Sequence, residues 1–81
     1  MGVKDDPHKL LSASMRRLRE QHEWSQEKLA EMSGLHRTYI GAVERLERNP
    51  SLASMKRIAD AFELETWELL CPVRQLSVRQ R

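Results

Sequence analysis

The chain has 81 residues, of which 40% are hydrophobic and 32% are charged, and its formal net charge is +2 at pH 7. This length allows one small domain with a modest core, and the single cysteine, Cys71, excludes an internal disulfide. Because no apolar run approaches the roughly 18 residues of a membrane-spanning helix, we expect a cytoplasmic protein with no membrane partner. The small net charge is weak support for nucleic-acid binding, so that case depends on where the charges lie.

Apolar residues recur at helical spacing along the chain, which predicts an all-α domain of five helices. The expected helices cover residues 9–22, 25–32, 36–45 and 51–62, followed by a short last helix that Thr66 caps and Pro72 ends. We expect residues 1–8 to be a flexible segment, residues 9–71 the folded domain, and residues 72–81 a basic tail.

Each predicted helix has an apolar side that we expect to face the core. The inward residues are Leu11, Met15, Leu18, Leu29, Ala30, Ile40, Val43, Leu52, Met55, Ile58, Ala59, Phe62, Trp67, Leu70 and, at the edge of the set, Met32.

The two short helices over 25–32 and 36–45 are joined by a tight turn. Ser25 is a good N-cap, and Gly34 can end the first of the two helices because glycine readily takes a positive φ. We expect the apolar side chain of Leu35 to fill the inner side of the turn. Two helices joined by a glycine-containing turn form the general helix-turn-helix signature, which purely structural helix pairs share. The signature alone leaves both interpretations open.

Several further motifs stand in order around this turn. They are SQEKLA at 25–30, Gly34, RTYI at 37–40, Glu44-Arg45, NPS at 49–51 and LETWELL at 64–70. Together they resemble the lambda-repressor/Cro-like (XRE) family over roughly residues 11–70, and HRTYI and the short length are also similar to controller proteins of restriction–modification systems. The resemblance implies a sequence-specific regulator of transcription that binds double-stranded DNA, as a dimer on a partly palindromic operator.

The start of the third helix holds the residues that we expect to read bases. Arg37 is the best candidate for direct readout, since a guanidinium fits guanine O6 and N7, with an ordinary surface arginine as the alternative. Thr38 offers a methyl group to thymine or a hydroxyl to phosphate, unless it is a plain helix residue. Gln26 has a family counterpart that contacts a phosphate or a nearby base.

The other expected DNA contacts surround this position. Tyr39 either packs its ring on the fold or also reaches a phosphate, and His36 caps the third helix, touches a phosphate, or does neither. Gly41 and Ala42 would let the helix approach the groove closely, although glycine weakens a helix by roughly 0.5–1 kcal/mol relative to alanine. Two further expected contacts, both to phosphates, are Arg45 and Arg48.

The resemblance also implies an ion pair between Arg19 and Glu44 that ties the first helix to the third. The chain departs from the family pattern directly afterwards, where Leu46 and Glu47 replace a glycine and a basic or polar residue. Leu46 should avoid the left-handed conformation that glycine adopts easily, so we expect the third helix to run on or end differently. Glu47 would repel DNA if it faced the backbone.

The last helix is expected to mediate association. With Trp67 and Leu70 turned inward, Leu69 remains as the interface candidate. The full expected interface is Phe62, Glu63, Glu65, Thr66 and Leu69. Cys71 is expected to be a passive small side chain.

Nothing in the sequence resembles a phosphate loop, a metal cluster or a nucleophile arrangement, so we expect no enzyme, no metal and no cofactor. The expected partners are double-stranded DNA, a second copy of the chain and RNA polymerase, which an operator-bound dimer would block or recruit. An alternative from another class is a protein-interaction adaptor, antitoxin-like or co-activator-like, that uses the same helical fold.

Overall fold

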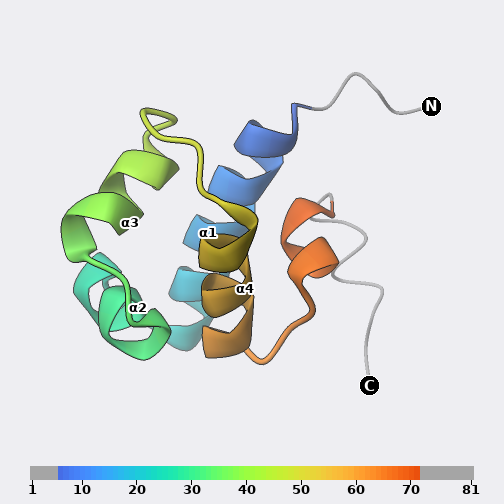
Figure 1. Cartoon of the computed structure of the whole chain (residues 1–81). Coiled ribbons are helices and arrows are strands. Elements are labelled where there is room, and N and C mark those ends of the chain that lie inside the picture. The colour runs from blue at the N-terminus through green and yellow to red at the C-terminus, as the bar shows by residue number, and fades with distance from the viewer. Residues whose placement is uncertain (1–5, 72–81) are drawn as a thin grey trace.

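The computed structural model describes residues 6–71 (Figure 1). This part of the chain holds four α-helices and a short 3-10 helix, which are α1 (Pro7–His22), α2 (Gln26–Ser33), α3 (Arg37–Glu44), α4 (Leu52–Ala61) and η1 (Thr66–Leu70). The predicted all-α class is confirmed, although the fifth element is a 3-10 helix. Residues 1–5 and 72–81, which include most of the predicted flexible segment, Pro72 and the predicted basic tail, lie outside the described residues.

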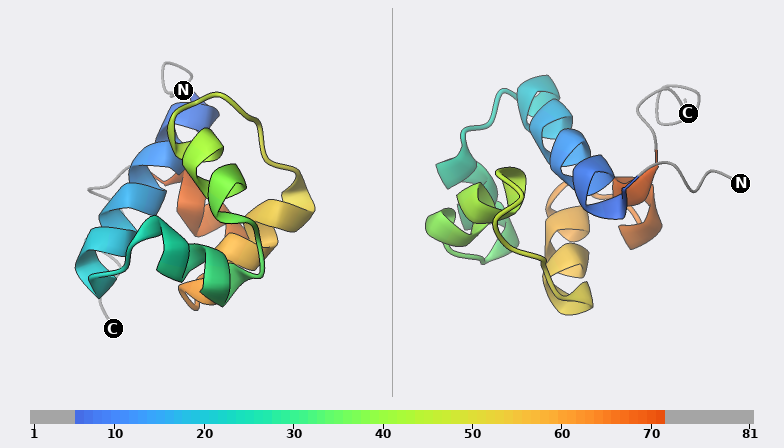
Figure 2. Two further views of the ribbon diagram at one scale, coloured as in Figure 1. Left: turned by 90° about the vertical axis from the view of Figure 1, so that its left-hand side faces the viewer. Right: turned by 90° about the horizontal axis from the view of Figure 1, so that it is seen from above.

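The elements pack so that the helix-turn-helix and η1 lie at opposite ends of the domain. α1 contacts both α3 and η1, while α4 contacts both α2 and η1. In Figure 1 and in the right-hand view of Figure 2, α2 and α3 lie together at one end and η1 lies at the other. No helix within residues 6–71 is long and apolar enough to cross a membrane.

The helix starts follow from local capping. The Asp6 carboxylate accepts a hydrogen bond from the His8 N–H, and Pro7 occupies the first turn, where its missing N–H costs nothing. α1 therefore begins two residues before the predicted position. Ser25 and Ser51 cap α2 and α4 in the same way, each accepting an N–H bond from the residue three positions later.

The four α-helices all end through a residue in the left-handed conformation. These residues are Glu23, Gly34, Leu46 and Glu63, with φ values of 59°, 76°, 65° and 60°. After α3, the Glu47 N–H donates to the Ala42 carbonyl at 2.8 Å and the Leu46 N–H to the Val43 carbonyl at 3.1 Å. This pair of bonds is the Schellman motif, which satisfies carbonyls left over at a helix end.

The expectation that Leu46 would avoid this conformation is wrong. A left-handed residue other than glycine costs roughly 1–2 kcal/mol. The two backbone hydrogen bonds offset that cost, and the Leu46 side chain lines a shallow hollow with Ala13 and Arg16 of α1. α3 consequently stops at Glu44 and does not run on.

The core contains most of the predicted apolar residues. Its buried members are Leu11, Met15, Leu18, Leu29, Ala30, Ile40, Val43, Met55, Ile58, Ala59, Phe62 and Leu69. Two expected core residues, Met32 and Leu52, are instead exposed. Both lie on short helices whose inward side is already filled, Met32 at the end of α2 and Leu52 in the first turn of α4.

η1 is rotated relative to the prediction. Leu69 is fully buried and Trp67 is 54% exposed, so these two residues exchange their expected positions, while Leu70 is half-buried and packs against the core as expected. The cap of this helix is Glu65 and not Thr66, because the side chains of Glu65 and Glu68 each accept the backbone N–H of the other residue. Since a 3-10 helix has three residues per turn, anchoring Glu68 in this way places Leu69 against the core. Leu69 and Phe62 therefore offer little surface to a second chain.

Candidate nucleic-acid interface

The turn between α2 and α3 depends on Gly34. Its φ of +76° suits glycine, and a Cβ at this position would lie 3.1 Å from Arg57 Nη1 on α4. The N–H groups of Gly34 and Leu35 both donate to the Ala30 carbonyl, at 2.9 and 3.1 Å. The turn is thus held by its own backbone, and it sets the direction in which α3 leaves α2.

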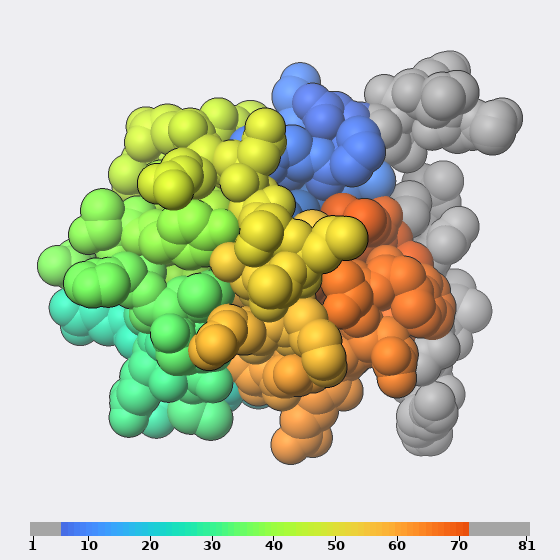
Figure 3. Space-filling model, in the orientation of Figure 1, coloured from blue at the N-terminus to red at the C-terminus, as the bar shows by residue number. Residues whose placement is uncertain are grey.

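α3 has one buried face and one exposed face. Ile40 and Val43 are fully buried, while Arg37 and Thr38 at its first turn are exposed. Positions four residues apart share a helix face, so Arg37, Gly41 and Arg45 follow one another along the outer side, where the Arg45 and Gln26 side chains cover Gly41. Figure 3 shows α3, the segment after it and the start of α4 as one continuous surface.

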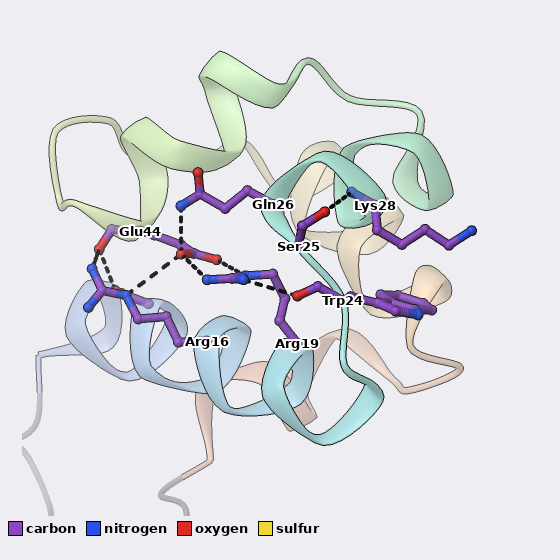
Figure 4. A network of polar contacts seen from close by, with 8 residues as sticks. Arg16, Arg19, Trp24, Ser25, Gln26, Lys28 and Glu44 are labelled. Carbon is purple, nitrogen blue, oxygen red and sulfur yellow. Dashed lines mark hydrogen bonds and ion pairs between the residues drawn. The ribbon is translucent and has the colours of Figure 1, made fainter.

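The buried face ends at the Glu44 carboxylate, whose side chain is 1% exposed. Arg19 of α1 donates to both carboxylate oxygens, from Nε to Oε2 at 2.7 Å and from Nη2 to Oε1 at 2.9 Å. Gln26 of α2 donates from Nε2 to Oε1 at 3.0 Å. Figure 4 shows these side chains converging on Glu44 from separate helices. The structure therefore brings Arg19 and Glu44 together and adds Gln26 to the pair.

The backbone carbonyl of Glu44 is held as well. Ser12 Oγ donates to it at 2.6 Å and Arg16 Nη2 at 2.8 Å, which satisfies a carbonyl at the end of α3. Arg19 Nη1 also reaches the Trp24 carbonyl at 3.1 Å. Neither Ser12 nor Arg16 was predicted from the sequence as a partner of Glu44. The only signal for Ser12 was a hydroxyl beside the apolar stripe of the first helix, which does not name its partner.

Gln26, Gly41 and Arg45 lie together on the outer side of α3. A Cβ on the buried Gly41 would be 2.9 Å from Arg45 Nη1 and 3.3 Å from Gln26 Oε1. Arg45 thus lies back along α3 over position 41, and the absence of a side chain there makes room for it. Ala42 is half-buried beside them.

A second group of expected contacts surrounds a hollow of about 430 Å³ between the starts of α3 and α4. Its polar and basic lining residues are His36, Tyr39, Arg48, Asn49, Ser51 and Ser54. Arg48 Cζ lies 5.4 Å from the centroid of the Tyr39 ring, a cation–π contact that positions the guanidinium. His36 occupies the N-cap position of α3 but makes no side-chain capping bond. Asn49, Ser51 and Ser54 were not among the expected contacts.

The remaining candidate, Arg37, has an acidic neighbour. Its Nε lies 3.4 Å from Glu27 Oε2, and both side chains are mostly exposed. Such a pair contributes about 0–1 kcal/mol, so it leaves Arg37 available to another partner. Within residues 6–71, no group of three or more His, Cys, Asp or Glu side chains could hold a metal ion.

Comparison with known proteins identifies the architecture. Residues 15–69 match the family described as helix-turn-helix. Control protein C.SmaI of Serratia marcescens is 46% identical over 65 residues, which cover 80% of this chain and 77% of the relative.

Solved structures agree. A hypothetical transcription factor from Neisseria, NHTF, superimposes with a TM-score of 0.82 at 38% identity, covering 90% of this chain and 85% of that one. The restriction–modification controller protein C.AhdI from Aeromonas hydrophila gives a TM-score of 0.72 at 42% identity, covering 76% of this chain and 94% of that one. With its buried Glu44, its Gly34 turn and its exposed α3, this chain belongs to the XRE-type helix-turn-helix family of DNA-binding transcriptional regulators.

Proposed function

We propose that this chain acts as a controller-type regulator. The first turn of its α3 enters the major groove of an operator. The observation that carries the proposal is the exposed Arg37 and Thr38 at the start of α3, with a basic group on each side. Arg45 lies over Gly41 on one side, and Arg48 stacks on Tyr39 on the other. Arg37 would read guanine and Thr38 a thymine methyl, while the flanking groups contact phosphates and set the register.

We propose that a second DNA phosphate binds in the hollow beside Tyr39. Arg48 supplies a positive charge there, and the first turn of α4 supplies N–H groups and the positive end of its dipole. Ser51 accepts the Ser54 N–H at 3.0 Å in the free chain. Ser54 and His36 then offer side-chain donors at the rim of the same hollow.

We further propose that the chain works as a homodimer formed through the η1 end. Trp67 is exposed there, with Glu63, Glu65 and Thr66 beside it on the surface or half-buried. Because η1 and α3 lie at opposite ends (Figure 1), pairing through η1 would leave both α3 helices open to DNA. Two half-sites one helical turn apart, about 34 Å, would then be read together.

The names of the relatives support a place in a restriction–modification system. Control proteins C.SmaI and C.BamHI and the controller C.AhdI are similar to this chain over most or about half of its length. A dimer bound near a promoter, on the bacterial nucleoid, would block or recruit RNA polymerase, and the concentration of the chain would set the occupancy.

Selection of bound sequences from a random duplex pool tests the proposal. We expect symmetric half-sites that contain a guanine, and we expect Arg37→Ala to relax the preference at that base while binding to other positions persists. Lys56→Ala, on the exposed side of α4, is the matched control and should leave the motif unchanged. An asymmetric or featureless motif would count against the proposal. No binding to any duplex at low salt would favour the adaptor function.

A further inference from the structure

The segment after α3 holds an ion pair that the family pattern did not lead us to expect. Arg45 Nε lies 3.1 Å from Glu47 Oε2, and Nη2 lies 3.2 Å from Oε1, so the guanidinium and the carboxylate meet through two hydrogen bonds. The hydrogen bond to Glu47 and the attraction of its charge raise the pKa of Arg45. We call this contact the Arg45–Glu47 pair.

The backbone turn that ends α3 brings Arg45 and Glu47 together. Leu46 lies between the two residues with a φ of +65°, which reverses the backbone. The Glu47 N–H is tied back to the Ala42 carbonyl at 2.8 Å, so the backbone that carries the carboxylate is itself held. Leu46 stands where the family pattern has glycine, and the reversal of the backbone at Leu46 places Glu47 against Arg45.

The third nitrogen of the guanidinium points to α3. Nη1 lies 2.9 Å from the place where a Cβ on Gly41 would be, beside Gln26 Oε1. Arg45 is consequently not extended from the end of α3. It lies along the outer face of α3, with two nitrogens on Glu47 and one over Gly41.

We propose that Glu47 is a positioning residue that holds Arg45 over Gly41 in the free protein, and that a DNA phosphate must displace the Glu47 carboxylate from Arg45. The inference rests on the proposed phosphate contact of Arg45. Guanidinium groups bind carboxylate and phosphate in the same two-bonded geometry, so one anion can replace the other. Both side chains are more than half exposed, and exposed pairs are weak, so a phosphate can compete.

The displacement has a measurable consequence. Because the Arg45–Glu47 pair must break before a phosphate binds Arg45, its loss offsets part of the free energy that the phosphate contact contributes. Because phosphate contacts carry no base information, Glu47 weakens binding to every sequence by a similar factor. Glu47 should also reduce the salt dependence of the binding affinity, because the slope of log affinity against log salt is proportional to the number of phosphates that the protein neutralises.

The test measures binding to a random-sequence duplex by fluorescence anisotropy across salt concentrations. Glu47→Gln should bind about three- to fivefold more tightly at low salt, and its plot of log affinity against log salt should steepen by about one unit. Asp60→Asn is the matched control, because Asp60 also sits in an exposed pair, with Lys56 Nζ at 3.3 Å. It makes the same charge change and should alter affinity less than about twofold.

A double-mutant cycle with Arg45→Gln separates positioning from simple repulsion. If Glu47 acts through Arg45, Glu47→Gln in the Arg45→Gln background should have no larger effect than Asp60→Asn. An undiminished gain in that background, or a Glu47→Gln gain equal to the control, would overturn the inference. Failure of the wild-type chain to bind any duplex at low salt would overturn the proposed function with it, whereas wild-type binding without a Glu47→Gln gain overturns the inference alone.

Discussion

Replacing Glu44 by glutamine should be among the most destabilising conservative changes in this protein. The substitution keeps the shape of the side chain and removes its charge. Arg19, whose side chain is only 17% exposed, then loses the anion that it contacts at 2.7 Å. A glutamine also has one carbonyl oxygen in place of two carboxylate oxygens, while Arg19 and Gln26 together donate three hydrogen bonds to this group.

The size of the effect follows from burial. Breaking one partner of a buried ion pair costs about 3–5 kcal/mol, and we expect about 3 kcal/mol here because Arg19 keeps its bond to the Trp24 carbonyl. A domain of this size has a free energy of unfolding of roughly 4–12 kcal/mol. At about 4–8 °C per kcal/mol, the melting temperature should fall by about 12–24 °C.

Thermal and urea unfolding followed by circular dichroism measure the change. Asp60→Asn, which removes the same charge from an exposed pair, should cost less than about 0.5 kcal/mol. Replacing both partners, as Arg19→Met with Glu44→Leu, should recover part of the loss because no charge is left buried. If Glu44→Gln cost no more than Asp60→Asn, the contact would be structurally idle and the reasoning would be refuted.

Three further predictions concern the ends and faces of the helices. Leu46→Gly should stabilise the domain by about 0.5–1 kcal/mol, because it removes left-handed strain at an exposed position; a loss of stability in urea unfolding would show that Leu46 packing on α1 dominates. Leu69→Ala should cost about 2–5 kcal/mol, whereas Trp67→Ala should leave the unfolding of the dilute chain nearly unchanged and weaken self-association in sedimentation; the opposite order would contradict the rotation of η1. Gly41→Ala should raise the melting temperature through helix propensity of up to about 1 kcal/mol, because the new Cβ meets only the flexible end of Arg45, whose Nη1 lies 2.9 Å away; a lower melting temperature would show that the close contact with Arg45 outweighs helix propensity.

The helix boundaries were largely predictable because they depend on near neighbours. A serine at the cap of α2 or α4 bonds a backbone group three residues away, and Gly34 ends α2 through its own φ. The error at Leu46 arose because backbone hydrogen bonds outweigh the preference of its side chain. Leu46 disfavours the left-handed conformation by itself, yet the two hydrogen bonds that close the end of α3 hold it there.

The orientation of the last helix was not predictable from spacing. Trp67 and Leu70 are three residues apart, which fits the inward side of a short helix, yet Leu69 is fully buried, Leu70 is half-buried and Trp67 is exposed. The capping contact between Glu65 and Glu68 holds the helix in this rotation.

By itself, the sequence determined the all-helical class, the helix-turn-helix and the exposed start of α3, because each depends on residues within one or two helical turns. Only the tertiary structure decided that Gln26 joins the Arg19–Glu44 pair and that Arg45 lies over Gly41 beside Glu47. The reason is physical: the partners of Glu44 come from two other helices, α1 and α2, and no local rule specifies which side chains meet when separate helices close around one core.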